Sequence, residues 1–286
     1  MKRGIIFFLT VLILCVSCQK NGHTDKDAAS THKSKITVSN MSDEGSIEKV
    51  RAVLKKSVAG KDADDFIKAV KDYNNTIEKT GLTGAFEERV PVYDSDKIHE
   101  LWSAKKGDFL GTNCRITAFT LLKDTLKIKQ GPVDDALLFL DKDAIDTERI
   151  FNEGDKRRFM QLFSRVQTEN TKDIHIHAEK MKEHFSNIGF SQKAKMLSVV
   201  LHDNFDGDYL FIGHTGVLLE DAEGFLFLEK LSFAEPFQAV RFRTKQDCYE
   251  YLFLTYKHYR DETTAYPFIM ENGELIELEL YNAELY

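Results

Sequence analysis

Apolar residues recur at two different spacings along this chain, and the change of spacing separates a helical part from a strand-rich part. Between residues 46 and 80 they return every three or four positions, which predicts two amphipathic helices with a break near Gly60. The same helical spacing returns over residues 97–103, 114–123 and 155–200. We therefore expect helices through the N-terminal and central parts of the chain.

Three runs rich in aromatic and β-branched residues follow, at Tyr209–Leu219, Phe225–Leu231 and Pro236–Phe242. Short segments of turn-forming residues separate them, so these runs predict consecutive antiparallel strands. A helical pattern returns at Gln246–Tyr259. N-terminal helices followed by a meander of strands predict an α+β fold with an antiparallel sheet.

A different pattern occupies the N-terminus. Lys2 and Arg3 are cationic, and Ile5–Val16 is almost wholly apolar and contains no acidic residue. This order is typical of a signal peptide, and the apolar run is shorter than the roughly 20 residues that a membrane-spanning helix needs. Ser17 followed by Cys18 fits cleavage before a cysteine that then receives lipid such as palmitate. An ordinary secretory signal is the alternative.

The segment after Cys18 predicts a tether. Residues 19–34 contain no large apolar side chain, so this segment cannot bury enough surface to fold. The expected organisation is a signal peptide at 1–17, a lipidated flexible tether at 18–35 and a single α+β domain at 36–286. The lipid holds this domain at a membrane of the cell envelope, which is the outer membrane or the cell surface if the source is Gram-negative.

The charge balance excludes one class of partner. Removal of Lys2 and Arg3 with the signal leaves 37 of the 39 basic residues against 46 acidic ones, a net charge of -9. An acidic surface repels a phosphate backbone, so nucleic acid is not expected as a partner. Nothing in the pattern implies a cofactor, and we expect a monomer.

Four cysteines leave two thiols in the mature domain. Cys15 is discarded with the signal and Cys18 is blocked by lipid, so Cys114 and Cys248 remain. In an exported protein the two can form a disulfide, which is one open alternative. Cys248 falls within an apolar helical pattern and is expected to be a buried helix residue.

The surroundings of Cys114 favour reactivity instead. The sequence Gly111–Arg115 places Cys114 at the start of a predicted helix, after a glycine-bearing loop and beside Arg115. Helix N-termini and neighbouring cations lower the pKa of a thiol, so Cys114 is a candidate nucleophile. The backbone N–H of Cys114 and the side chain of Asn113 are candidate donors to an oxyanion. An inert cysteine near a helix cap is the alternative.

Among the nine histidines, His214 has the most unusual setting. Gly213 and Gly216 flank it in a run that is apolar on both faces, and glycine within a strand often marks the close approach of another backbone or a ligand. Such a histidine is either a hydrogen-bonded core residue or the base that a nucleophilic cysteine requires. His175 and His177 form a pair without further ligands, and no metal site is expected.

Glu229 favours the catalytic interpretation of His214. It falls on an otherwise aromatic face of its predicted strand, where a carboxylate needs a partner. A tight turn centred between Asp221 and Ala222 places Glu229 directly opposite His214, about 5 Å away, where it can orient the imidazole. A turn one residue longer opposes His214 with Lys230 instead.

A cysteine at a helix start, a histidine on a strand and a polar residue on the next strand resemble the order found in papain-like cysteine peptidases. Segments 111–118 and 213–229 most resemble the cell-wall peptidase branch called NlpC/P60. The resemblance implies a papain-like fold, with a helical insertion between Cys114 and His214 that is longer than usual. The residues on both sides of the cysteine differ from the aspartate and serine usual in that branch, which leaves the substrate open.

Over nearly its whole mature length, including 38–43 and 111–115, the chain also resembles a bacterial lipoprotein family catalogued as domain of unknown function 4300. That resemblance supports a lipid anchor and supplies no activity. We expect a membrane-tethered cysteine hydrolase, a peptidase or amidase, in which Cys114 attacks an amide of a peptide or of peptidoglycan-derived material, His214 transfers the proton and Glu229 orients His214. A non-catalytic binding lipoprotein on a peptidase-like scaffold and a transglutaminase-like acyl transferase are the alternatives.

Overall fold

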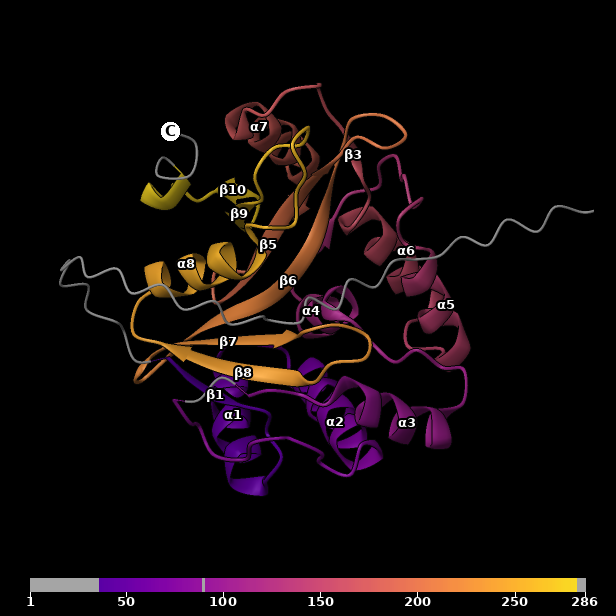
Figure 1. The fold of residues 1–286 in the computed structure, drawn as a ribbon, viewed down its shortest axis with the longest axis vertical. Coiled ribbons are helices and arrows are strands. Elements are labelled where there is room, and N and C mark those ends of the chain that lie inside the picture. Colours follow the sequence, from indigo (N-terminus) through magenta and orange to yellow (C-terminus); the bar gives the residue numbers. More distant parts are fainter. Residues whose placement is uncertain (1–35, 89–90, 282–286) are drawn as a thin grey trace, which may run out of the picture. The chain divides into compact units, whose positions relative to one another are not determined.

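The computed structural model describes residues 36–88 and 91–281, so the predicted signal peptide and the whole tether, including Cys18, lie outside the described residues. Within the described part an antiparallel sheet carries helices on both of its faces, which is the expected α+β class (Figure 1). No helix in this part of the chain is long and apolar enough to cross a membrane.

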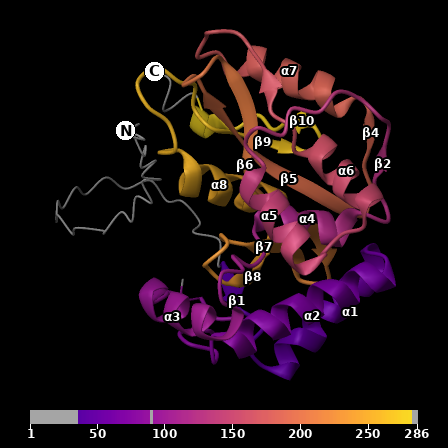
Figure 2. The ribbon, with the colours of Figure 1, turned by 90° about the vertical axis from the view of Figure 1, so that its right-hand side faces the viewer.

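The N-terminal helices form where the apolar spacing predicts them. α1 (Glu44–Ser57) is capped by Asp43, whose carboxylate accepts the backbone N–H of Ser46 at 2.8 Å. α2 (Gly60–Thr76) begins at the predicted break. α3 (Ser95–Lys106) then follows beside α2, and the three helices gather at one end of the described domain in both views (Figures 1 and 2).

The later helices partly depart from the expectation. The described chain forms α4 (Cys114–Leu122), α5 (Phe139–Glu148), α6 (Glu153–Leu162), α7 (Ile174–Phe185) and α8 (Lys245–Tyr256). α4 begins at the predicted residue and α8 matches the helical pattern near the C-terminus. α5 was not predicted, because its few apolar residues stand in adjacent pairs among charged ones and form no clear helical stripe.

A single sheet dominates the described domain. Its strands are β1 (Thr37–Ser39), β3 (Val166–Gln167), β5 (Ala194–Asp203), β6 (Tyr209–Asp221), β7 (Gly224–Lys230), β8 (Phe237–Phe242), β9 (Phe268–Glu271) and β10 (Glu274–Leu275). The order across the sheet is β1-β8-β7-β6-β5-β9-β10, with β3 also paired to β6 and every pair antiparallel. The predicted three-strand meander corresponds to β6, β7 and β8.

The prediction of helix through residue 200 is wrong for β5. This strand is buried on both faces between β6 and β9, so its apolar residues do not alternate with polar ones. Met196, Val199 and Val200 stand three and four positions apart, which is equally typical of a helix stripe. The two short strands β2 (Lys127–Ile128) and β4 (Ile188–Gly189), which form a separate ribbon, were also not predicted.

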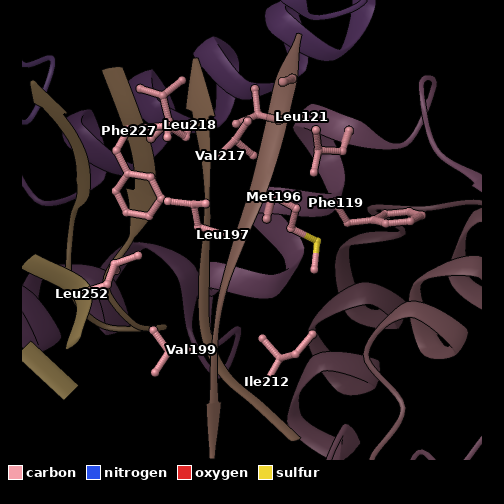
Figure 3. Packing of buried hydrophobic residues seen from close by; sticks show 14 of the residues in the cluster. Phe119, Leu121, Met196, Leu197, Val199, Ile212, Val217, Leu218, Phe227 and Leu252 are labelled. Atoms are coloured by element: carbon pink, nitrogen blue, oxygen red, sulfur yellow. The ribbon is translucent and has the colours of Figure 1, made fainter. Parts of the chain in front are cut away.

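Apolar layers pack on both faces of the sheet. Figure 3 shows Phe119 of α4 and Met196 of β5 on one side, and Leu252 of α8 and Val199 of β5 on the other. All four side chains are fully buried or nearly so. The sheet therefore separates α4 from α8 along most of its length, and side chains of successive strand residues face one helix or the other.

The register of the β6–β7 hairpin differs from the prediction. Asp221 pairs with Gly224, so Ala222 and Glu223 form a two-residue turn and Glu229 lies opposite Gly216 rather than opposite His214. The predicted pairing is wrong by two positions. Because side chains on a strand alternate with a period of two, a shift of two residues keeps Glu229 and His214 on the same face.

A bulge in β6 sets the position of His214. His214 pairs with Val199 of β5, but the next pair joins Ile212 to Val200, so Gly213 is an extra residue. A Cβ atom on Gly213 would lie 2.3 Å from Cδ1 of Leu201, which only glycine avoids. The group that approaches this glycine closely is therefore a side chain of the neighbouring strand β5.

Candidate active site

The start of α4 carries the thiol that the sequence singles out. Asn113 caps this helix, because its Oδ1 accepts the backbone N–H of Ile116 at 2.9 Å, and Cys114 is the first helical residue. A helix leaves its first N–H groups without intrahelical partners and carries a partial positive charge at this end. Cys114 is 6% exposed, so these effects act on a sulfur that is largely shielded from water.

A buried carboxylate holds this helix start in place. Asp141 of α5 is fully buried and accepts hydrogen bonds from Nδ2 of Asn113 at 2.7 Å and from Nε and Nη2 of Arg115 at 3.0 and 2.6 Å. Arg115 also donates from Nη1 to the carbonyl of Ile212 in β6. The residues on both sides of Cys114 are thus anchored to α5 and to the sheet.

These contacts bear on the expected role of Asn113. Its Oδ1 caps the helix and one N–H of its Nδ2 is donated to Asp141, so at most one amide proton remains for an oxyanion. The backbone N–H of Cys114, which the helix leaves without an intrahelical partner, is the better-supported donor. Asp141 carries no recognisable signal in the sequence pattern, since it lies in a helix that was not predicted.

His214 and Glu229 meet in the interior. Nε2 of His214 lies 2.6 Å from Oε2 of Glu229, and each residue is 1% exposed. The two residues are diagonal neighbours on adjacent strands, and the long side chain of Glu229 spans this distance. The predicted contact therefore forms although the register differs by two residues. The other carboxylate oxygen, Oε1, accepts the hydroxyl of Tyr251 of α8 at 3.0 Å. Glu229 is therefore held by two donors.

Tyr256 of α8 covers the other side of the histidine. Its ring stacks on the His214 imidazole with a centroid distance of 4.7 Å and an interplanar angle of 21°. The stack restrains the ring plane and excludes water from the bond to Glu229. Neither Tyr251 nor Tyr256 was predicted as a site residue. The sequence of α8 shows only an apolar pattern, and it does not reveal that this helix packs beside His214 and Glu229.

The thiol and the imidazole interact with each other. Burial alone raises the pKa of Cys114, but the charge and hydrogen bond of His214, the charge of Arg115 and the backbone N–H of Thr215 outweigh it and lower that pKa. β7 pairs with β6 only as far as Gly216, so the edge of β6 at His214 and Thr215 faces the start of α4. Because Nε2 of His214 is engaged by Glu229, Nδ1 is left for the thiol.

The histidine responds in the opposite sense. Burial lowers the pKa of His214, whereas the charge and hydrogen bond of Cys114, and then those of Glu229, raise it to about 10. A lowered thiol pKa beside a raised imidazole pKa describes a buried thiolate–imidazolium pair. Nucleophilic cysteines are activated by this kind of pairing.

The second mature thiol has no such partner. Cys248 of α8 is fully buried, as predicted, and both Cys114 and Cys248 are free thiols in the described chain. Burial, followed by the charges of Glu229 and Glu271, raises the pKa of Cys248 well above its ordinary value. The disulfide alternative is therefore absent from this structure.

The other histidines do not form a metal site among the described residues. His175 is exposed and faces Glu277, whereas His177 is fully buried and bonds to Thr168 and to the carbonyl of Thr171. His177 is buried because it lies on the inner face of α7.

Comparisons with known proteins support one statement of relationship. A family model described as domain of unknown function (DUF4300) matches residues 37–276. No curated protein and no solved structure gives a significant match.

Proposed function

We propose that this chain, which belongs to the DUF4300 family, is a cysteine hydrolase of papain-like arrangement that cleaves an amide bond. One observation carries the proposal: the thiol at the start of α4 is paired with a buried imidazole whose second nitrogen is held by a carboxylate 2.6 Å away. Nucleophile, base and orienting group in this relation recur on unrelated folds that perform acyl transfer. Fold similarity alone supplies no activity, so the site is the basis of the proposal.

The proposed reaction has two stages. The Cys114 thiolate attacks the amide carbonyl carbon, and the oxyanion accepts hydrogen bonds from the free N–H groups at the start of α4. His214 then donates its proton to the amine nitrogen as the C–N bond breaks, which leaves a thioester on Cys114. Water, deprotonated by His214, attacks the thioester, and the carboxylate product leaves while Cys114 and His214 return to their paired form.

Glu229 and Tyr251 act on the orientation of the base. Glu229 holds Nε2 of His214 and so keeps Nδ1 directed at the sulfur, while its carboxylate stabilises the imidazolium. Tyr251 fixes the second carboxylate oxygen. Both residues touch the base rather than the reacting atoms, so they are positioning residues.

The proposed substrate is a peptide or a peptidoglycan-derived amide. This follows from the predicted export signal and lipid tether, which direct the domain to the cell envelope, and from the acidic surface, which does not suit nucleic acid. The test is incubation of the purified domain with muropeptides and with a mixed peptide library, followed by mass spectrometry. New amine and carboxylate ends that Cys114→Ala does not produce support hydrolysis. Amine-linked products instead indicate the acyl-transfer alternative.

One observation favours a second candidate, a non-catalytic binding protein. Cys114 is only 6% exposed and His214 only 1%, so an amide substrate reaches the sulfur only if covering side chains move. A peptide-based electrophile and iodoacetamide distinguish the two functions. In a hydrolase, both reagents modify Cys114. In a binding protein whose thiol stays covered, peptide-based electrophiles of any length leave Cys114 unmodified.

We further propose that Cys18, which lies outside the described residues, carries the lipid anchor. The supporting pattern is the apolar run Ile5–Val16 followed by Ser17 and Cys18. Metabolic labelling with a fatty acid should mark the wild-type protein and not Cys18→Ala, which is left as an unlipidated precursor. Label on the variant would contradict the anchor without affecting the proposal for Cys114.

A further inference from the structure

A buried ammonium group lies one residue beyond Glu229, on the opposite face of β7. Lys230 is 1% exposed, and lysine is almost never fully buried without partners. Its Nζ donates to three backbone carbonyls, those of Ser232 at 2.8 Å, Phe233 at 3.2 Å and Glu235 at 2.6 Å. Three donated bonds use all three protons of an ammonium ion, which a neutral amine cannot match.

Aromatic rings complete the surroundings of Lys230. Its Nζ lies 4.2 Å from the centroid of the Tyr73 ring and 5.2 Å from that of Phe237, which are cation–π distances. The Tyr73 hydroxyl donates to the carbonyl of Ala234 at 2.5 Å. All four carbonyls of the turn at residues 232–235 are thus bonded by Lys230 or Tyr73, so these two side chains hold the turn.

This turn packs against the loop that leads into the nucleophile. The carbonyl of Phe233 lies 3.3 Å from the position of a Cβ atom on Gly111, three residues before Cys114, and the Trp102 ring lies 3.0 Å from the same position. Gly111 has a φ of 91°, which glycine adopts readily. The loop is therefore confined between Trp102 and the turn that Lys230 organises.

The ammonium ion is also electrostatically coupled to the thiol. Burial lowers the pKa of Lys230 to about 7, and the charges of Glu235 and Cys114 oppose that effect. The other cation near the thiol, Arg115, is bonded to the buried Asp141 and also lowers the pKa of Cys114. Lys230 directs its hydrogen bonds to carbonyl groups, and the charge of Glu235 favours its ammonium form.

We propose that Lys230 is a positioning residue for Cys114, which fixes the turn at residues 232–235 against the nucleophile loop and keeps a positive charge beside the thiolate. The inference rests on the proposed role of Cys114 as nucleophile. It assigns to a residue in β7 a part in the reaction that the order of cysteine, histidine and carboxylate does not include.

The test is the pH dependence of Cys114 alkylation by iodoacetamide, measured by site-resolved mass spectrometry on the folded domain. Lys230→Met should raise the midpoint of this dependence by about half a pH unit or more, because a cation that favours the thiolate is removed. The rate at pH 6.5 should then fall about threefold. Lys123→Met is the matched control: Lys123 is also buried, but it ends α4 and pairs with Asp62. It should lower thermal stability and leave the midpoint unchanged.

Tyr73→Phe is the second variant, and it decides the test if Lys230→Met does not fold. It keeps Lys230 and the aromatic ring but removes the bond to Ala234, so alkylation at high pH should slow by about twofold or more with an unchanged midpoint. A folded Lys230→Met with the wild-type rate and midpoint overturns the proposal, as does a wild-type profile in Tyr73→Phe when Lys230→Met is unfolded. Failure of the proposed function has a different signature, since the wild-type thiol itself then titrates like an ordinary cysteine and His214→Ala changes nothing.

Discussion

Cys114 and Cys248 are two buried free thiols near the starts of two helices, and their surroundings act in opposite directions. Cys114 is the first residue of α4 and Cys248 the fourth of α8. The pKa of Cys114 is lowered against its burial by the charge of His214, whereas the pKa of Cys248 is raised by burial and by the charges of Glu229 and Glu271. The helix start is common to both thiols, so the neighbouring charges make the difference.

The same carboxylate takes part in both environments. Glu229 bonds to His214, which stabilises the imidazolium beside Cys114, and its negative charge disfavours a thiolate at Cys248 on the α8 side of the sheet. One buried acid therefore favours the thiolate of Cys114 through the histidine and disfavours the thiolate of Cys248 directly. Substitutions that remove one of these contributions at a time should change the difference between the two thiols.

The largest effect is expected from the thiols themselves. Cys114→Ala should abolish amide cleavage, a loss of about 10³-fold or more, because no nucleophile remains. Cys248→Ala should leave cleavage unchanged, since this thiol contacts none of the reacting groups. Product formation by both variants under identical conditions is the measurement, and equal loss in the two would show that neither thiol is the nucleophile.

The second-largest effect is expected from removal of the His214 imidazole. His214→Ala takes away the charge that outweighs burial, so the pKa of Cys114 should rise above the free-thiol range and resemble that of Cys248. Alkylation of Cys114 at pH 7 should slow by about tenfold or more. Stopped-time alkylation of wild type and variant measures this, and an unchanged rate would mean that the imidazole does not activate the thiol.

Glu229→Gln should lower the pH above which His214 loses its proton and stops favouring the Cys114 thiolate. The folded His214 pKa of about 10 lies above its unfolded value, so the folded protein keeps the imidazolium at neutral pH and loses it as pH rises through about 10. Without the Glu229 charge this loss should occur at lower pH, and cleavage should fall by roughly tenfold at neutral pH. The alkaline limb of the pH–rate profile checks the shift. Glu220→Gln, an exposed carboxylate near the β6–β7 turn, is the control and should keep the wild-type limb.

The smallest effect concerns the stacked ring. Tyr256→Leu removes the contact with His214, which should cost about 1 kcal/mol of folding stability and lower the melting temperature by about 2–4 °C. Cleavage should fall only a few-fold, because Glu229 still orients the imidazole. Differential scanning calorimetry and steady-state kinetics measure the two effects, and a loss as large as that of His214→Ala would assign Tyr256 a direct part in the reaction.

The local parts of this account were predictable from the sequence, and the long-range parts were not. The start of α4 at Cys114 follows from the apolar spacing, and the pairing of His214 with Glu229 follows from strand alternation, which tolerates an error of two residues in register. Asp141 could not be found in this way, because its contact with Arg115 joins segments 26 residues apart through an unpredicted helix. Lys230 does carry a signal, because a lysine within an otherwise apolar strand needs buried partners.

β5 shows why pattern alone fails in the centre of a sheet. Its residues are buried on both faces, so the alternation that identifies a half-buried strand is absent and helix and strand spacings fit equally well. The error did not affect the site, because His214 and Glu229 lie on the neighbouring strands β6 and β7.

The proposed function requires that Cys114 is a thiolate activated by His214 while Cys248 is inert. Site-resolved alkylation across pH, performed on the folded domain and again in denaturant, measures both thiols in one experiment. We expect that folded Cys114 reacts with a midpoint below the free-thiol value of about 8.5, that folded Cys248 is protected, and that both thiols titrate alike when unfolded. A folded Cys114 that is as protected as Cys248, or that titrates at or above the unfolded value, would contradict it.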